Sequence, residues 1–160
     1  MFARPLIDSL EFARNGKEMH GEIALSELSR LSDVLVKTDG SLIYMVRGYR
    51  EAGRDMLGLS LQGKCSLRCQ RCLGELEYSV NIVSQLQLLP ADKLDEVKED
   101  DDEMDVIEAE SKLDVVALIE EEMLLELPFA PRHTEGGCAQ TANDLQQKVS
   151  PFAVLAGLKK

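Results

Sequence analysis

Two long segments of alternating apolar and polar side chains, one on each side of a cysteine pair, constrain the fold of this 160-residue chain more than any other feature. Before the pair, apolar residues recur at alternate positions over residues 57–67. After it, the same alternation runs over residues 76–88 and stops before Pro90. Because successive side chains of a strand point to opposite faces, each segment predicts a strand with one buried face. We expect the two strands to pair antiparallel through a turn at residues 69–74.

Weaker patterns predict further elements. We expect a strand at residues 42–49, joined to the next strand by a loop at residues 50–53. A shorter strand is expected at residues 20–25 and a short helix at residues 26–31.

A longer helix is predicted between Ser111, a suitable N-cap, and Pro128, which stops a helix. Apolar residues surround most of this helix, so we expect it to be deeply packed. Ser150 and Pro151 have the order of an N-cap and a first helical residue, which predicts a C-terminal helix. The expected fold is α+β and forms a single domain over residues 1–160. It consists of an antiparallel, strongly bent β-sheet or partial barrel with one long buried helix and short terminal helices.

Acidic residues concentrate in one segment of the chain. The formal net charge is −11, and residues 92–110 contain 11 acidic and 2 basic residues, which accounts for nine of these charges. A run of like charges repels itself in a compact fold, so we interpret residues 92–110 as a solvated linker. The alternative is that this segment binds a basic partner or covers the protein's own basic residues.

The cellular location that we expect depends on whether the sequence contains long apolar segments. No apolar stretch reaches the roughly 20 residues of a membrane-spanning helix, and the N-terminus has no apolar signal region. We therefore expect a cytoplasmic protein. Its four cysteines then stay reduced, which favours metal binding, redox chemistry or core packing over a disulfide framework.

Basic residues cluster around the predicted hairpin although the whole chain is acidic. Six cations fall within residues 40–72, where only two acids occur. They are Arg47, Arg50, Arg54, Lys64, Arg68 and Arg71. Cations of this kind bind RNA phosphates without reading the sequence. The alternative is that they are ordinary surface residues that keep strand edges soluble.

Cys69 and Cys72 are the strongest chemical signal, because two thiolates three positions apart on a turn can share one tetrahedral ion. His133 and Cys138 are the candidate remaining ligands, since the glycines between them allow that loop to fold back. We therefore predict a zinc site at these four residues. Cys65 is expected to pack in the core, because the alternation puts it on the buried strand face.

Two other interpretations of these cysteines remain open. The thiols can be plain turn and core residues, or the pair can act in thiol redox chemistry with the neighbouring arginines stabilising a thiolate. A separate alternative concerns the carboxylates at residues 120–122, which are either satisfied or solvated helix residues or a catalytic pair.

Taken together, several motifs resemble the YceD family of bacterial large ribosomal RNA subunit accumulation proteins. They are the Cys69-Gln-Arg-Cys72-Leu73 turn, the acidic stretch, the helix segment 113–128, His133 and Cys138, and the ending Pro151-Phe-Ala-Val-Leu. The resemblance implies a cytoplasmic, non-catalytic factor required for accumulation or processing of large-subunit (23S) ribosomal RNA. By position it carries over Cys69, Cys72 and Cys138 with the adjoining Arg71, but not Cys65.

These lines join in one functional hypothesis, a ribosome-biogenesis factor whose basic hairpin contacts large-subunit ribosomal RNA or a pre-ribosomal particle. Three apolar residues of the segment 150–160 are expected to dock on a protein partner such as a ribosomal protein or an RNA-processing enzyme, or to pack on the core: Phe152, Leu155 and Leu158. The alternative is a protein-interaction adaptor that never contacts RNA. We expect no membrane partner and no small-molecule substrate.

Overall fold

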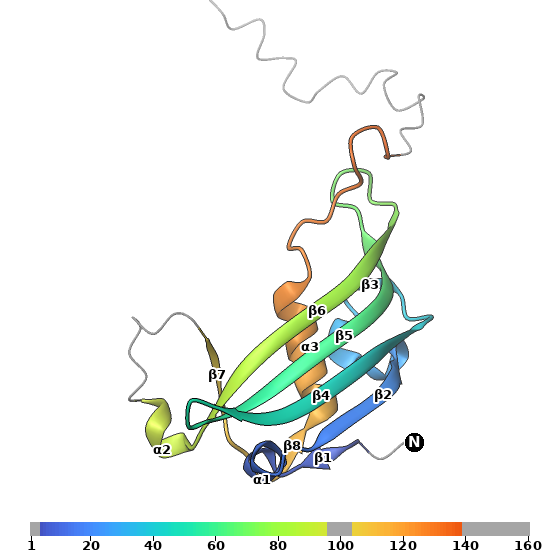
Figure 1. Cartoon of the computed structure of the whole chain (residues 1–160). Coiled ribbons are helices and arrows are strands. Elements are labelled where there is room, and N and C mark those ends of the chain that lie inside the picture. The colour runs from blue at the N-terminus through green and yellow to red at the C-terminus, as the bar shows by residue number, and fades with distance from the viewer. Residues whose placement is uncertain (1–3, 96–103, 139–160) are drawn as a thin grey trace, which may run out of the picture.

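The computed structural model describes residues 4–95 and 104–138 and has a mixed α+β architecture made mostly of strands (Figure 1). The large sheet contains β2 (Glu18–Ala24), β3 (Leu35–Lys37), β4 (Ser41–Glu51), β5 (Arg54–Arg68), β6 (Glu75–Leu89) and β7 (Asp105–Glu108). Its order is β2-β4-β5-β6-β7, with β3 beside the far end of β5. A small second sheet pairs β1 (Leu6–Ile7) with β8 (Leu113–Asp114).

The predicted central hairpin is confirmed. β5 and β6 pair antiparallel from Asp55 opposite Leu88 to Arg68 opposite Glu75. The apolar positions of the alternating pattern lie on one face and form a large part of the core, and Cys65 on that face is only 4% exposed. The turn at residues 69–74 therefore lies at the far tip of two 15-residue strands.

β4 joins β5 through the two-residue turn Ala52-Gly53, which is shorter than the predicted loop. Both residues have positive φ, 49° and 79°. This is the combination of a type I′ turn, whose twist suits a strand pair, so β4 continues to Glu51 rather than ending at Tyr49.

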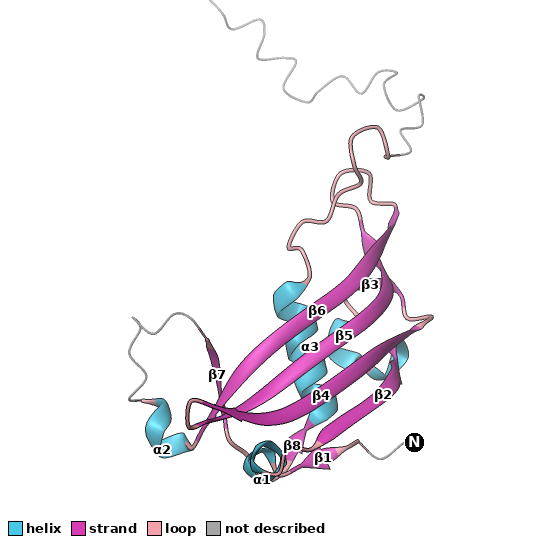
Figure 2. Ribbon diagram, viewed as in Figure 1, coloured by secondary structure: helices cyan, strands magenta, loops and turns pink. Residues whose placement is uncertain are grey.

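α3 (Val115–Glu126) lies behind the sheet in Figure 2, whereas α2 (Ala91–Leu94) lies to the side, near β7, and has no buried residue. The other helices are α1 (Ser9–Arg14) and two 3₁₀ helices, Leu25–Glu27 and Ser29–Leu31. α1 approaches β4 so closely that a Cβ atom on Gly48 would lie 2.7 Å from the Ala13 Cα. The side chains of α3 that pack under the sheet include Ile119 and Met123, both fully buried.

The sheet differs from the expected antiparallel, strongly bent sheet or partial barrel in two respects. β7 pairs parallel with β6, through Leu86–Leu89 opposite Asp105–Glu108. The sheet is also not closed, because β2 and β7 are its two ends, so the partial barrel is not confirmed.

The helices also differ in detail from the predictions. β8 occupies Leu113 and Asp114, and the Asp114 carboxylate caps α3 by accepting hydrogen bonds from the backbone N–H groups of Val116 and Ala117. The N-cap is therefore Asp114 and not Ser111, and α3 has only 12 residues. The helix expected at residues 26–31 is a pair of 3₁₀ turns instead.

Two predicted regions lie partly or wholly outside the described residues. Of the acidic segment 92–110, the structure places residues 92–95 and 104–110, including β7. The C-terminal helix and the docking residues Phe152, Leu155 and Leu158 lie outside the described residues. Among the helices of residues 4–95 and 104–138, none combines the length and apolar character needed to cross a membrane.

Candidate metal centre

Two loops that are distant in the sequence meet at the tip of the β5–β6 hairpin. The first is the turn at residues 69–74, closed by the Cys69 N–H, which donates to the Gly74 carbonyl at 2.9 Å. The second is the segment 131–138, which follows α3. The Gln70 N–H donates to the Pro131 carbonyl at 2.8 Å and joins the two loops (Figure 1).

The four predicted ligands gather between these loops. The Sγ atoms of Cys69, Cys72 and Cys138 and a ring nitrogen of His133 all lie within 4.8 Å of one another. Cys69 Sγ and Cys138 Sγ are 3.8 Å apart, and His133 Nδ1 lies 3.4 Å from Cys72 Sγ and 3.6 Å from Cys138 Sγ.

These separations match the edges of a zinc tetrahedron. With Zn–S near 2.3 Å and Zn–N near 2.0–2.1 Å, tetrahedral ligands are separated by roughly 3.8 Å for S···S and roughly 3.6 Å for N···S. A set of three thiols and one imidazole is also a common structural zinc set. The donor atoms present can therefore hold Zn²⁺ in a closed, structural site.

The surroundings of His133 orient its ring for this role. Its Nε2 lies 2.9 Å from the carbonyl oxygen of Glu75, the first residue of β6. A hydrogen bond donated by Nε2 leaves Nδ1, which faces the thiols, without a proton and free to ligate. Metal-binding histidines commonly have such a carbonyl partner.

Arg71 belongs to the same cluster. Its Nε donates to Cys138 Sγ at 3.0 Å, and its guanidinium also reaches the carbonyl oxygens of His133 and Thr134 at 3.3 and 3.4 Å. This cation holds the pKa of the Cys138 thiol below its usual value. Arg71 therefore contributes to holding the second loop in place.

The other ligands differ in how their surroundings shift their pKa values. Hydrogen bonding from the backbone N–H of Cys72 is the main cause that lowers the pKa of Cys69 to about 5. The Gly74 N–H lowers the pKa of Cys72, but burial and the neighbouring thiols outweigh it, so the net shift is upward. Contact with Cys138 raises the pKa of His133. Two of the three sulfurs thus favour the charged form that binds metal.

Cys65 does not belong to the cluster. It lies on the core face of β5, and burial raises the pKa of its thiol to about 11. Its packing role is the one expected from the alternation.

The six predicted RNA-binding cations fall into two groups rather than one patch. Lys64, Arg68 and Arg71 lie near the metal centre. Arg54 lies at the opposite end of β5, about 45 Å away at 3.3 Å per residue. Arg50 and Arg47 lie toward Arg54, since they pair with Asp55 and Gly58 in the sheet.

Several of these cations contact acidic groups. Lys64 Nζ lies 2.9 Å from Glu77, Arg47 Nε 3.2 Å from Glu18, and Arg50 Nε 3.0 Å from Asp55. Within the described residues, neither Arg54 nor Arg68 forms an ion pair, and both are exposed.

We call the tip of the β5–β6 hairpin with the candidate metal centre the metal end. The structure adds two cations there that the sequence analysis missed. Arg132 precedes the ligand His133 and is exposed; its position beside a candidate ligand was an available signal. Lys37 on β3 lies opposite Ser66 of β5 and pairs with Glu75 at 2.6 Å. No sequence pattern indicated it, because β3 has only three residues.

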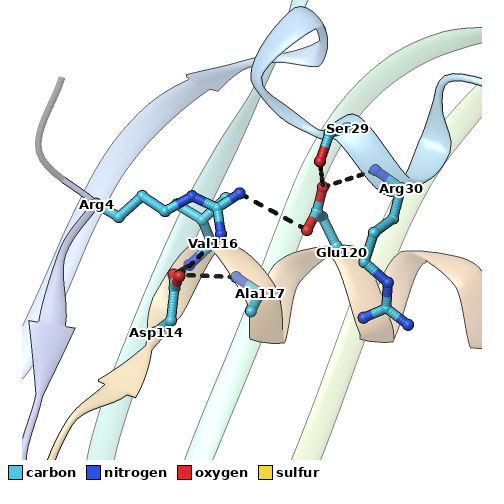
Figure 3. A network of polar contacts seen from close by, with 7 residues as sticks. All are labelled: Arg4, Ser29, Arg30, Asp114, Val116, Ala117 and Glu120. Atoms are coloured by element: carbon cyan, nitrogen blue, oxygen red, sulfur yellow. Dashed lines mark hydrogen bonds and ion pairs between the residues drawn. The ribbon is translucent and has the colours of Figure 1, made fainter. Parts of the chain in front are cut away.

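The carboxylates of α3 are satisfied by neighbouring groups. Glu120 is 2% exposed and accepts hydrogen bonds from the Arg30 N–H at 3.0 Å and the Ser29 hydroxyl at 3.5 Å, while the Arg4 guanidinium lies 3.9 Å away (Figure 3). Glu122 accepts from the Ser84 hydroxyl on β6. Glu120 thus ties α3 to a 3₁₀ helix, which fits the interpretation of a satisfied carboxylate.

Comparison with known proteins agrees with the resemblance drawn from the motifs. The family described as "Large ribosomal RNA subunit accumulation protein YceD" matches residues 57–159. A protein of Haemophilus influenzae named Large ribosomal RNA subunit accumulation protein YceD is 24% identical over 169 residues, covering 96% of this chain and 94% of its own. No solved structure matches this chain.

Proposed function

This chain belongs to the YceD family, and we propose that it promotes accumulation or processing of large-subunit ribosomal RNA as a binding factor rather than an enzyme. The family match, which includes the metal-end hairpin and its ligand loop, carries this proposal. The relative's name states a process and not a chemical step, so the proposed role is to contact RNA or a pre-ribosomal particle.

The proposed RNA contact is the metal end of the hairpin. Arg68, Lys64 and Arg132 are exposed around the two joined loops. The Lys64 pair with Glu77 involves two side chains that are 66% and 69% exposed, and such pairs are weak enough for a phosphate to displace the acid. Phosphate contacts of this kind give affinity without sequence specificity.

We further propose that zinc is the ion held by Cys69, Cys72, His133 and Cys138. When bound, it would link the hairpin turn to the loop that follows α3 and so fix the relative positions of Arg68 and Arg132. The full burial of Cys69 supports this role over the redox alternative, because an attacking thiol needs solvent access.

We keep two predictions from the sequence in this proposal. The acidic segment 92–110 acts as a linker outside β7, and Phe152, Leu155 and Leu158 dock on a protein partner. The alternative function, an adaptor without RNA contact, draws support from the contacts of Arg47, Arg50 and Lys64 with acids, since these reduce the free positive charge.

The proposed function is tested in a bacterium from which the gene for this protein has been deleted. Wild-type protein should restore the ratio of large-subunit to small-subunit ribosomal RNA, and tagged protein should recover large-subunit RNA. Nuclease treatment before recovery should remove the ribosomal proteins that accompany it. Partners that survive nuclease treatment, with no RNA cross-linked to the chain, would favour the adaptor instead.

A further inference from the structure

β6 has a long edge that no strand of the described residues covers. β5 pairs with one edge of β6 along nearly its whole length, but β7 covers only Leu86–Leu89 on the other edge. In a paired strand, every second residue points its N–H and C=O away from the neighbour. Between residues 77 and 85, the described residues provide no backbone hydrogen bond to that outer edge.

This edge lacks the features that usually protect strand edges from pairing. Such edges carry lysine, proline or a bulge, or are very short. β6 contains no proline, glycine, lysine or arginine, and its uncovered part of nine residues is roughly 30 Å long. An unprotected edge of this length is suited to accept another strand.

One exposed apolar side chain of α3 lies beside this edge. Glu122 of α3 contacts Ser84 of β6, which fixes the side of the helix that faces this strand. At 100° per residue, Leu125 lies about 60° around the helix from Glu122, and it is 76% exposed. Leu118 of the same helix is only 5% exposed, and it lines a groove of about 340 Å³ with Ile107 of β7. A strand added to β6 would lie beside Leu125 and cover it.

The charge around the edge is negative, which defines the partner. Of the four glutamates of α3, Glu120 and Glu122 are buried and hydrogen-bonded, whereas Glu121 and Glu126 are exposed. β7 contributes the exposed Asp105 and Glu108, and Lys112 is a base that lines the neighbouring groove. Glu75 and Glu77 of β6 already pair with Lys37 and Lys64 and do not add to this charge. Exposed positions of a bound strand would therefore favour lysine or arginine, with apolar residues at the alternate positions that face α3.

We propose that residues 77–85 of β6 bind an extended, basic segment of a partner protein as an added strand. Apolar side chains of that segment pack on Leu125, and its cations face the exposed acids of α3 and β7. This interface is separate from the proposed RNA contact at Arg68.

A labelled 12-residue peptide that alternates lysine and valine tests this proposal in fluorescence anisotropy with the full chain. The Leu125→Ser variant should bind it about tenfold more weakly, because it removes a large apolar contact. Ile43→Ser is the matched control, since Ile43 is 63% exposed on β4 and should leave binding unchanged. The Arg68→Glu variant should also bind normally, so failure of the RNA contact and failure of this interface are distinct results.

Hydrogen exchange shows whether the peptide adds as a strand. Bound peptide should slow exchange of amides within residues 77–85, and its N-methylated form, which lacks the amide hydrogens, should not bind. Equal binding of a glutamate-valine peptide or of the N-methylated peptide would overturn the proposal. Protection of these amides in the free monomer would also overturn it, because this chain would then already cover the edge. A dimer that Leu125→Ser dissociates would overturn it too, because a second copy of this chain would then cover the edge.

Discussion

The Sγ atoms of Cys69 and Cys138 lie 3.8 Å apart, although 69 positions separate the two residues in the chain. This contact places the loop after α3 against the central hairpin. It brings together ligands that form two separate groups in the sequence, and we expect them to share one ion.

Protein purified without added zinc should contain one zinc ion per chain by elemental mass spectrometry. Cys138→Ser removes one of four ligands and should lower the retained metal by at least about tenfold, in line with the cost of losing a direct ligand. Cys65→Ser is the control, because its thiol lies in the core and should leave the metal content unchanged. A well-folded wild-type protein without metal would contradict the site.

Cys65 should resist alkylation in the native protein. Burial raises the pKa of its thiol to about 11, so only about one molecule in a thousand carries the reactive thiolate at pH 8. The thiolate fraction rises as the pH approaches 11, and the reaction should accelerate accordingly. Iodoacetamide labelling followed by peptide mass spectrometry measures this. Equal labelling of Cys65 in native and urea-unfolded protein at pH 8 would show that the residue is not buried.

Glu120→Ala should lower the free energy of unfolding by about 1.5–3 kcal/mol, because it removes the buried, charged acceptor of the hydrogen bonds from the Arg30 N–H and the Ser29 hydroxyl. Urea unfolding measures the change. Glu121→Ala, at an exposed position of the same helix, should change stability by less than about 0.5 kcal/mol. Equal effects of the two substitutions would refute the structural role of Glu120.

Gly48→Ala should destabilise the protein by about 1–3 kcal/mol, since the added methyl group would collide with the backbone of α1. For a chain of this size, a change near 2 kcal/mol lowers the melting temperature by about 4–8 °C. Gly58→Ala is the control in the neighbouring strand, where the nearest atom, Tyr49 Cε1, would lie 3.5 Å away. A Gly48→Ala protein that melts like wild type would mean that α1 does not pack directly on β4.

The sequence predicts the hairpin well because a half-buried strand imposes a period of two on its side chains. This period determined which face of β5 carries Leu61 and Cys65. The sequence did not predict β7, because its four residues lie in an acidic segment without this alternation. They are held by parallel pairing with β6, a contact that exists only in the folded chain. The N-cap is Asp114 and not Ser111 for a similar reason. β8 occupies Leu113 and Asp114, so the helix begins only after this strand.

The sequence predicted the ligands of the candidate site better than the positions of the cations around it. Cysteine and histidine types at suitable spacing indicated a common ion, and the two loops do bring them together. The six cations lie close together in the sequence, but they do not form one patch, because the length of β5 separates Arg54 from Arg68. Arg71, predicted as an RNA contact and, in the redox alternative, as a residue that stabilises a thiolate, donates to the Cys138 sulfur.

Cross-linking to precursor large-subunit RNA in cells tests the central claim most directly, with Arg68→Glu and Arg54→Glu as matched charge reversals. Both side chains are exposed and free of ion pairs within the described residues, but only Arg68 lies at the metal end. Arg68→Glu should lower cross-linking by about fivefold or more through phosphate repulsion, while Arg54→Glu stays within about twofold of wild type. Equal cross-linking of all three proteins would contradict an RNA contact at the metal end.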